Sequence, residues 1–200
     1  MGDARGAIDR VAERFPDFVI SRHDLLGDQT VVVRREGLVP VLTMLRDEPD
    51  LAFVMPVDVT CVDRLGLGEK PFHTTAPLSP GVLTLDPLPA VAPGHRFEVV
   101  YHLRSPLLRA VVRVKVPVEE SDPAVPTSTG VFKGFNWFER EVFDMFGVRF
   151  EGHPDLRRIL MYPEFVGHPL RKDYPRRGYQ PLVDMPRLRG DPVPGARGPS

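Results

Sequence analysis

Residues 135–147 read FNWFEREVFDMFG and mix large apolar side chains with charged ones along one short segment. One apolar stripe recurs there at helical spacing and consists of Phe135, Phe138, Val142 and Met145. Three more apolar residues lie off that stripe, namely Trp137, Phe143 and Phe146. A helix that is apolar nearly all round is buried, and charges within it then need partners. The segment therefore predicts a buried helix, enclosed by the tail of this chain or by another protein.

The charged residues of this helix are Glu139, Arg140, Glu141 and Asp144, and Gly147 stands where a helix-ending glycine is expected. Carboxylates at i,i+3, such as Glu141 and Asp144, can do acid–base chemistry when burial separates their pKa values, or can hold a divalent metal. Alternatively they pair with arginines of the tail or of a partner, and Arg140 is placed to pair with Asp144 at i,i+4. The pattern favours structural pairing.

Two Gly-His-Pro triplets, at 152–154 and 167–169, place His153 and His168 in the tail. Two histidines and a carboxylate would suit zinc or non-haem iron. A proline after each histidine favours extended backbone, however, and no compact ligand spacing such as His-Glu-x-x-His occurs. Histidines held in turns are the preferred interpretation. A small metal-dependent hydrolase that uses Glu141, Asp144, His153 and His168 remains the alternative of a different class.

The composition of the chain excludes several classes of function. The chain has 200 residues and a net charge of −1, so neither nucleic acid nor an acidic membrane surface would attract it. A single cysteine, Cys61, excludes an internal disulfide and an all-cysteine iron–sulfur site. No apolar run approaches the roughly 20 residues that span a bilayer, and no Gly-rich nucleotide loop or nucleophile elbow is present. We therefore expect a cytoplasmic chain with no catalytic, cofactor-binding or metal site of its own.

Periodicity predicts helices over 7–15, 37–46 and 135–147, and strands over 18–20, 30–34, 53–62, 95–103 and 108–118. This order indicates an α+β fold, a two-layer domain with one mixed sheet and helices packed on it, followed by an extended C-terminal arm. We assign residues 1–150 to the domain, 66–93 within it to a proline-rich inserted loop, and 151–200 to a Pro/Arg-rich tail that wraps on partners.

Two motifs resemble the signature of the C subunit of NADH:quinone oxidoreductase, which is respiratory complex I. The first is FEREVFDMFG at 138–147, followed by FEGHPDLRRIL at 150–160. The second is GHPLRKDYP at 167–175, at a separation similar to the family's. Residues 97–103 look more weakly like the family's penultimate strand. The loop over 66–93 departs from the family by its length, and the tail past Pro175 matches nothing in it.

The resemblance implies a structural, cofactor-free subunit in the peripheral arm of the complex, on the cytoplasmic side of the bacterial inner membrane. Its expected neighbours are the D, B and I subunits of complex I, and the flavin mononucleotide (FMN), iron–sulfur clusters and quinone would lie in partner subunits. Membrane association would come only through the assembled complex. An equivalent subunit of a membrane-bound hydrogenase or another donor:quinone complex is the related alternative.

The same resemblance marks thirteen residues as signature or inter-subunit contacts: Glu139, Arg140, Glu141, Asp144, Gly147, His153, Arg157, Arg158, His168, Arg171, Lys172, Asp173 and Tyr174. Arg140 and the three acids of the helix are expected to form buried ion pairs with the tail or with the D subunit.

Overall fold

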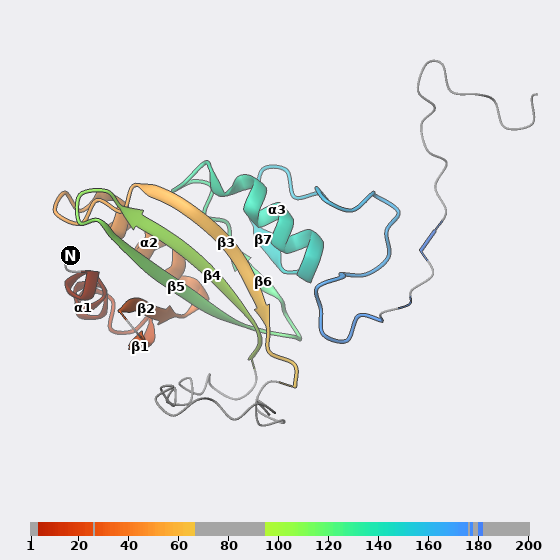
Figure 1. The fold of residues 1–200 in the computed structure, drawn as a ribbon, viewed down its shortest axis with the longest axis horizontal. Helices are drawn as coiled ribbons and strands as arrows, with labels where there is room; N and C mark the ends of the chain where they lie inside the picture. Colours follow the sequence, from red (N-terminus) through yellow and green to blue (C-terminus); the bar gives the residue numbers. More distant parts are fainter. Residues whose placement is uncertain (1–3, 26, 67–94, 176, 178–179, 182–200) are drawn as a thin grey trace, which may run out of the picture.

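A five-stranded mixed sheet forms the body of the domain in the computed structural model, which describes residues 4–25, 27–66, 95–175, 177 and 180–181 (Figure 1). The strands are β1 (Val19–Leu25), β2 (Asp28–Val33), β3 (Met55–Asp63), β4 (His95–Ser105) and β5 (Ala110–Glu119). They lie in the order β1-β2-β5-β4-β3, and only the β2–β5 pair is parallel. The sheet is therefore mixed, as expected.

Two helices pack on one face of this sheet, α1 (Ala4–Arg14) and α2 (Leu38–Asp47), and α3 (Phe135–Phe146) lies beside β3 (Figure 1). The inward-pointing residues of neighbouring strands are in register, since Val99 of β4 lies between Cys61 of β3 and Val116 of β5. Val99 and Val116 are fully buried, and burial raises the pKa of the Cys61 thiol to about 12. The cysteine is thus an unreactive part of the core.

The opposite face of the sheet carries charged side chains that pair across strands. Lys115 of β5 donates to the carboxylate of Glu98 at 2.9 Å, and Arg64 donates to the same carboxylate at 3.3 Å. Arg113 bonds Asp28 at 2.7 Å. The alternation predicted for residues 108–118 is confirmed, because the valines of β5 at 112, 114 and 116 are buried on the other face.

The remaining elements are short: the 3-10 helix η1 (Arg35–Gly37) and a two-stranded parallel sheet of β6 (Ala124–Pro126) and β7 (Arg149–Glu151). The α+β fold with a mixed sheet is confirmed. Segments of three residues carry too little periodicity to be predicted, and β6 and β7 were missed for that reason. Apart from Gly66, the proline-rich loop at 66–93 lies outside the described residues. Within the described part of the chain, no helix is long and apolar enough to cross a membrane.

The described part of this chain leaves one side of α3 uncovered, and cover by another protein, the second possibility that the sequence left open, stays a prediction. Trp137 is 70% exposed and Glu141 is also exposed, because both lie one turn apart on the ridge that faces away from β3. The stripe residues Phe135 and Val142 are buried as expected. Gly147 follows the helix in the left-handed conformation, with φ 75°, as predicted for the residue that ends it.

Candidate subunit-interaction site

Asp144, fully buried near the end of α3, anchors the segment that follows β7, residues 152–175, which we call the arm. Its Oδ2 accepts three successive backbone N–H groups, from Ile159 at 3.1 Å, Leu160 at 2.8 Å and Met161 at 2.8 Å. Its Oδ1 accepts from Arg158 at 2.6 Å. Burial by itself would raise the pKa of this carboxyl, but these donors outweigh burial and hold the pKa below its usual range. Asp144 therefore acts as a fixed anion around which the arm turns.

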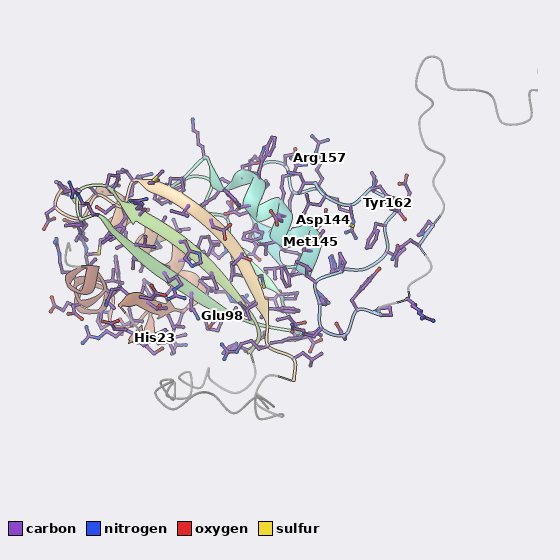
Figure 2. The ribbon with its side chains drawn as sticks, viewed as in Figure 1. His23, Glu98, Asp144, Met145, Arg157 and Tyr162 are labelled. Atoms are coloured by element: carbon purple, nitrogen blue, oxygen red, sulfur yellow. The ribbon has the colours of Figure 1, made fainter. Side chains whose placement is uncertain are left out.

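Figure 2 shows the relation of helix and arm, with Asp144 and Met145 on α3 and with Arg157 and Tyr162 on the arm beside it. Arg158 joins two stretches of the arm at the end of α3, because its guanidinium also donates to the Gly167 carbonyl at 3.1 Å. The arm thus doubles back on itself across the end of the helix.

The arm also covers the C-terminal end of α3. The His168 Nδ1–H donates to the Asp144 carbonyl at 2.9 Å, and Arg171 Nε donates to the Phe146 carbonyl at 2.6 Å. The last carbonyls of a helix have no partner within it and carry its negative dipole end, so both donors are well placed. Burial lowers the pKa of His168, and the positive charges of Arg171 and Arg158 lower it further, so the ring stays neutral.

Gly147 makes this close approach possible. A Cβ at this position would meet His168 Nε2 at 2.5 Å and Arg171 Nη2 at 2.6 Å. The glycine therefore serves two purposes, since it adopts the left-handed conformation and leaves room for the two arm side chains.

Glu139 lies one turn earlier on α3 and is also fully buried. Its carboxylate accepts from the Ser128 backbone N–H at 2.7 Å, from the Ser128 hydroxyl, and from the Thr127 hydroxyl at 2.5 Å. Burial raises the pKa of Glu139 above its usual range despite these donors. This acid ties the loop before α3 to the helix, a contact that the sequence did not reveal because nothing marks Thr127 or Ser128 as partners.

His153 links the start of the arm to the same turn of α3. Its Nε2–H donates to the Asn136 carbonyl at 3.2 Å, and its Nδ1 accepts the backbone N–H of Asp155 at 3.0 Å. Its Nε2 lies 4.0 Å from the Glu139 carboxylate. The histidine is held in a turn, as preferred from the sequence.

Arg140 does not pair with Asp144, so the expected i,i+4 ion pair is wrong. It donates instead to two arm carbonyls, of Arg157 at 3.1 Å and Arg158 at 3.2 Å, and lies 3.9 Å from the Asp155 carboxylate. The reason is that Asp144 is already saturated by Arg158 and three amides. Arg157 itself is exposed and reaches only Asp155, at 3.0 Å.

A second anchor joins the far end of the arm to the sheet. Arg96 of β4 bonds both oxygens of Asp63, at 3.1 and 2.9 Å, and Asp173 at 2.6 Å. The backbone N–H of Lys172 donates to Asp63 at 2.8 Å, whereas the Lys172 side chain is exposed. Arg96 also bonds Glu120. Arg96 and Asp63 were missed from the sequence, where the only signal was an acid at the end of an apolar strand.

Tyr174 packs against an earlier part of the arm. Its ring stacks on Phe165 at 6.1 Å between centroids, and Gln180 bonds its hydroxyl. The Gln180 amide also pairs with Val166, accepting its N–H at 3.0 Å and donating to its carbonyl at 3.2 Å. The Arg158 guanidinium lies over the same aromatic pair, 5.7 Å from the Phe165 ring centroid.

Three large apolar side chains of the arm remain uncovered while its backbone is held: Leu160 at 55%, Val166 at 65% and Leu170 at 52% exposure. We call these three the apolar row. Contiguous exposed apolar surface is typical of sites where another protein binds.

The four residues considered for a hydrolase metal site do not form one ligand set. Asp144 and His168 form hydrogen bonds between α3 and the arm, His153 contacts the other end of the helix, and Glu141 is exposed to solvent. Among the described residues, no group of three or more His, Cys, Asp or Glu side chains could hold a metal ion. The geometry gives this alternative no support.

The sequence matches, over residues 31–180, the family described as respiratory-chain NADH dehydrogenase, 30 Kd subunit. It is 39% identical over 178 residues to the C subunit of the NADH-quinone oxidoreductase of Trichlorobacter lovleyi, covering 89% of this chain and 93% of that protein. The corresponding C subunit of Roseiflexus sp. is 40% identical over 173 residues, with 86% and 84% covered.

Two solved structures resemble the fold. A trypsin-resistant fragment (1-134) of Nqo5 superposes with a TM-score of 0.53 and 30% identity, covering 75% of this chain and 99% of the fragment. A chain of an archaeal membrane-bound sulfane sulfur reductase superposes with a TM-score of 0.55 and 19% identity, covering 78% of this chain and 75% of that one. At that identity, the second likeness shows the fold alone.

Proposed function

Since the chain belongs to the family of the 30-kDa subunit of respiratory-chain NADH dehydrogenase, we propose that it holds neighbouring subunits of an NADH-quinone oxidoreductase together through α3 and the arm. The oxidoreductase activity belongs to the multi-subunit complex, and this chain is not its catalytic centre. FMN, iron–sulfur clusters and quinone are carried by other subunits, and we propose that this chain binds none of them.

The observation that carries the proposal is the apolar row on a fixed backbone. Asp144, Arg158 and His168 hold the arm at both sides of its turn, so Leu160, Val166 and Leu170 are presented in a defined arrangement. An interface residue that is already ordered loses less conformational entropy on binding than a mobile one. The arm is therefore suited to dock on a partner rather than to fold on it.

We further propose that the partners are the D, B and I subunits, and that the chain lies on the cytoplasmic side of the membrane and reaches it only through them. The thirteen signature residues divide accordingly. Most secure the arm to the domain, including Asp144, Gly147, His168 and Arg171, whereas Glu141, Arg157 and Lys172 point outward and are free to meet a partner.

The test is to replace the apolar row with serine at all three positions and to purify the complex through a tag on another subunit. We expect the chain to remain folded and the yield of assembled complex to fall, while NADH:quinone turnover per assembled complex stays unchanged. The matched control places serine at Leu107 and Val111, which are 62% and 48% exposed near the β4–β5 hairpin. Normal assembly of the row variant, or reduced turnover of complex that assembles normally, would contradict the proposal.

A further inference from the structure

A groove of about 980 Å³ lies at the beginning of α3, beside the start of the arm. Its walls come from three places in the sequence: the loop at Thr129, the entry into α3 from Lys133 to Trp137, and the turn at Gly152 and Pro154. Glu139 and His153 fix these walls against one another from beneath, through Ser128 and Asn136. The groove is thus a built feature of the fold.

Three side-chain donors at this groove have no hydrogen-bond or ion-pair partner among the described residues. They are the exposed ammonium of Lys133, the amide of Asn136, and the indole N–H of Trp137. Neighbouring polar groups are already engaged, since Thr127 bonds both Glu139 and Thr129. An occupant that offers acceptors would satisfy donors that the described residues leave without a partner.

The charge of the lining has one sign. Lys133 is its only ionisable residue, and no acidic residue stands in the first turn of α3, whose N-terminal end has no side-chain cap. The positive end of the helix dipole therefore adds to the lysine charge. Glu141 is exposed one turn beyond Trp137 but does not line the groove. The buried Glu139 carboxylate lies beneath the groove and is already bonded by Thr127 and Ser128, so the charge that an occupant meets directly is that of Lys133. The occupant that this lining favours is anionic.

Trp137 gives the groove its apolar wall and is the only tryptophan of the chain, at 70% exposure. Tryptophan is enriched among the residues that dominate protein–protein binding energy, and its ring offers a large rigid surface with one donor. Main-chain carbonyls of an extended segment can accept from the Asn136 amide and the Trp137 indole N–H. This combination indicates a polypeptide.

We propose that the groove beside Trp137 binds an extended acidic segment of a neighbouring subunit. A carboxylate of that segment pairs with Lys133, its carbonyls accept from Asn136 and Trp137, and an apolar side chain or proline packs on the indole ring. The proposal rests on the function proposed above and adds a second contact, separate from the apolar row, so that the subunit holds its neighbours from two sides of α3.

The test places the photoreactive amino acid p-benzoylphenylalanine at position 137 in the full chain, within the assembled complex, followed by irradiation and mass spectrometry. We expect one major adduct, to a segment of another subunit with Asp or Glu within a few residues of the crosslink. An adduct only to the tail of this chain, to a second copy, to a lipid, or to nothing in a fully assembled complex would overturn the proposal.

Charge exchange provides the independent check. Lys133→Glu should reduce the adduct about tenfold, which corresponds to about 1.4 kcal/mol. Replacing the crosslinked acid by lysine should restore it. Arg104→Glu, at an exposed arginine of β4, is the matched control and should leave the adduct unchanged. An unaltered adduct in Lys133→Glu, or no rescue by the second change, would contradict the pairing.

The two proposals fail in distinguishable ways. If the serine variant of the apolar row loses assembly while the position-137 crosslink yields no partner adduct, the proposed function stands and the groove does not bind a subunit. If the chain does not co-purify with the complex under any condition, the proposed function itself is wrong.

Discussion

Arg158 reaches Asp144 through one guanidinium nitrogen, which donates to the carboxylate at 2.6 Å and to the main-chain carbonyl of the same residue at 3.3 Å. The arginine therefore donates hydrogen bonds to both the side chain and the backbone of Asp144 at the end of α3. Because the acid also accepts from three amides that follow the arginine, the two residues close a ring that substitution of either one opens.

Asp144→Asn should release the arm. The change removes the charge that faces Arg158 and leaves one amide donor opposed to another, at a cost of about 2–4 kcal/mol. Trypsin should cleave this variant faster after Arg158 and Arg171 than it cleaves the unmodified chain. Mass spectrometry of timed samples measures the cleavage. Glu141→Gln on the same helix is the control, because Glu141 is exposed, and its cleavage rates should match the unmodified chain. Equal rates for both variants would contradict the role assigned to Asp144.

Gly147→Ala should cost more than Gly27→Ala. Both glycines have positive φ, 75° and 89°, so each alanine is strained by about 1–2 kcal/mol. Only at Gly147 would the Cβ also meet His168 and Arg171, whereas nothing lies within 4 Å at Gly27. Urea unfolding followed by circular dichroism gives the difference, and cleavage after Arg171 should rise in the first variant alone. Equal losses of unfolding free energy would show that the arm does not need this close approach.

Glu139→Gln should be tolerated better than Glu139→Ala. The glutamine carbonyl can still accept from Ser128, and the Thr127 hydroxyl can rotate to accept from the new amide group. Alanine leaves the Ser128 N–H and hydroxyl buried without an acceptor, at about 1–3 kcal/mol, and adds a cavity. The thermal unfolding midpoints of the two variants measure the two losses of stability. The reverse order would mean that the negative charge itself is required at this position.

Docking of the arm should weaken in acid. The pKa values of Asp144 and Asp63 are held below their ordinary value of 3.8, so their stabilisation is fully present above that value and is lost as pH falls through the folded pKa. His168 acts in the same direction at higher pH, because its lowered pKa means that the unfolded chain binds a proton first as pH drops below 6.5. Glu139, whose pKa is raised, opposes this trend below its folded pKa. Unfolding free energies at pH 7, 5.5, 4 and 3 should therefore fall, and His168→Gln should flatten the upper part of the curve. A curve that rises towards pH 3 would contradict this account.

The sequence predicted the fold class and the long elements, because the valines of β5 alternate cleanly and the apolar residues of α2 recur at helical spacing. It also predicted that the acids of α3 anchor arginine, which holds for Asp144 with Arg158 but is wrong for Glu139, whose partners are Ser128 and Thr127, and for the exposed Glu141. It could not assign partners, since Arg140 binds carbonyls that no side-chain pattern encodes. Trp137 was expected to be covered by the tail or by another protein, and periodicity alone cannot show which of the two covers a large apolar residue.

Part of the arm's path is held through its main chain: Asp144 accepts from the amides of residues 159–161, Arg140 donates to the carbonyls of 157 and 158, and Arg158 donates to the carbonyl of Gly167. The arm side chains that fasten it, among them Arg158, His168 and Arg171, are not the exposed apolar ones. Leu160 and Val166 are therefore free to mutate without disturbing the path on which they stand. On the function proposed above, the side chains that meet a partner can therefore change while the attachment of the arm to α3 stays the same.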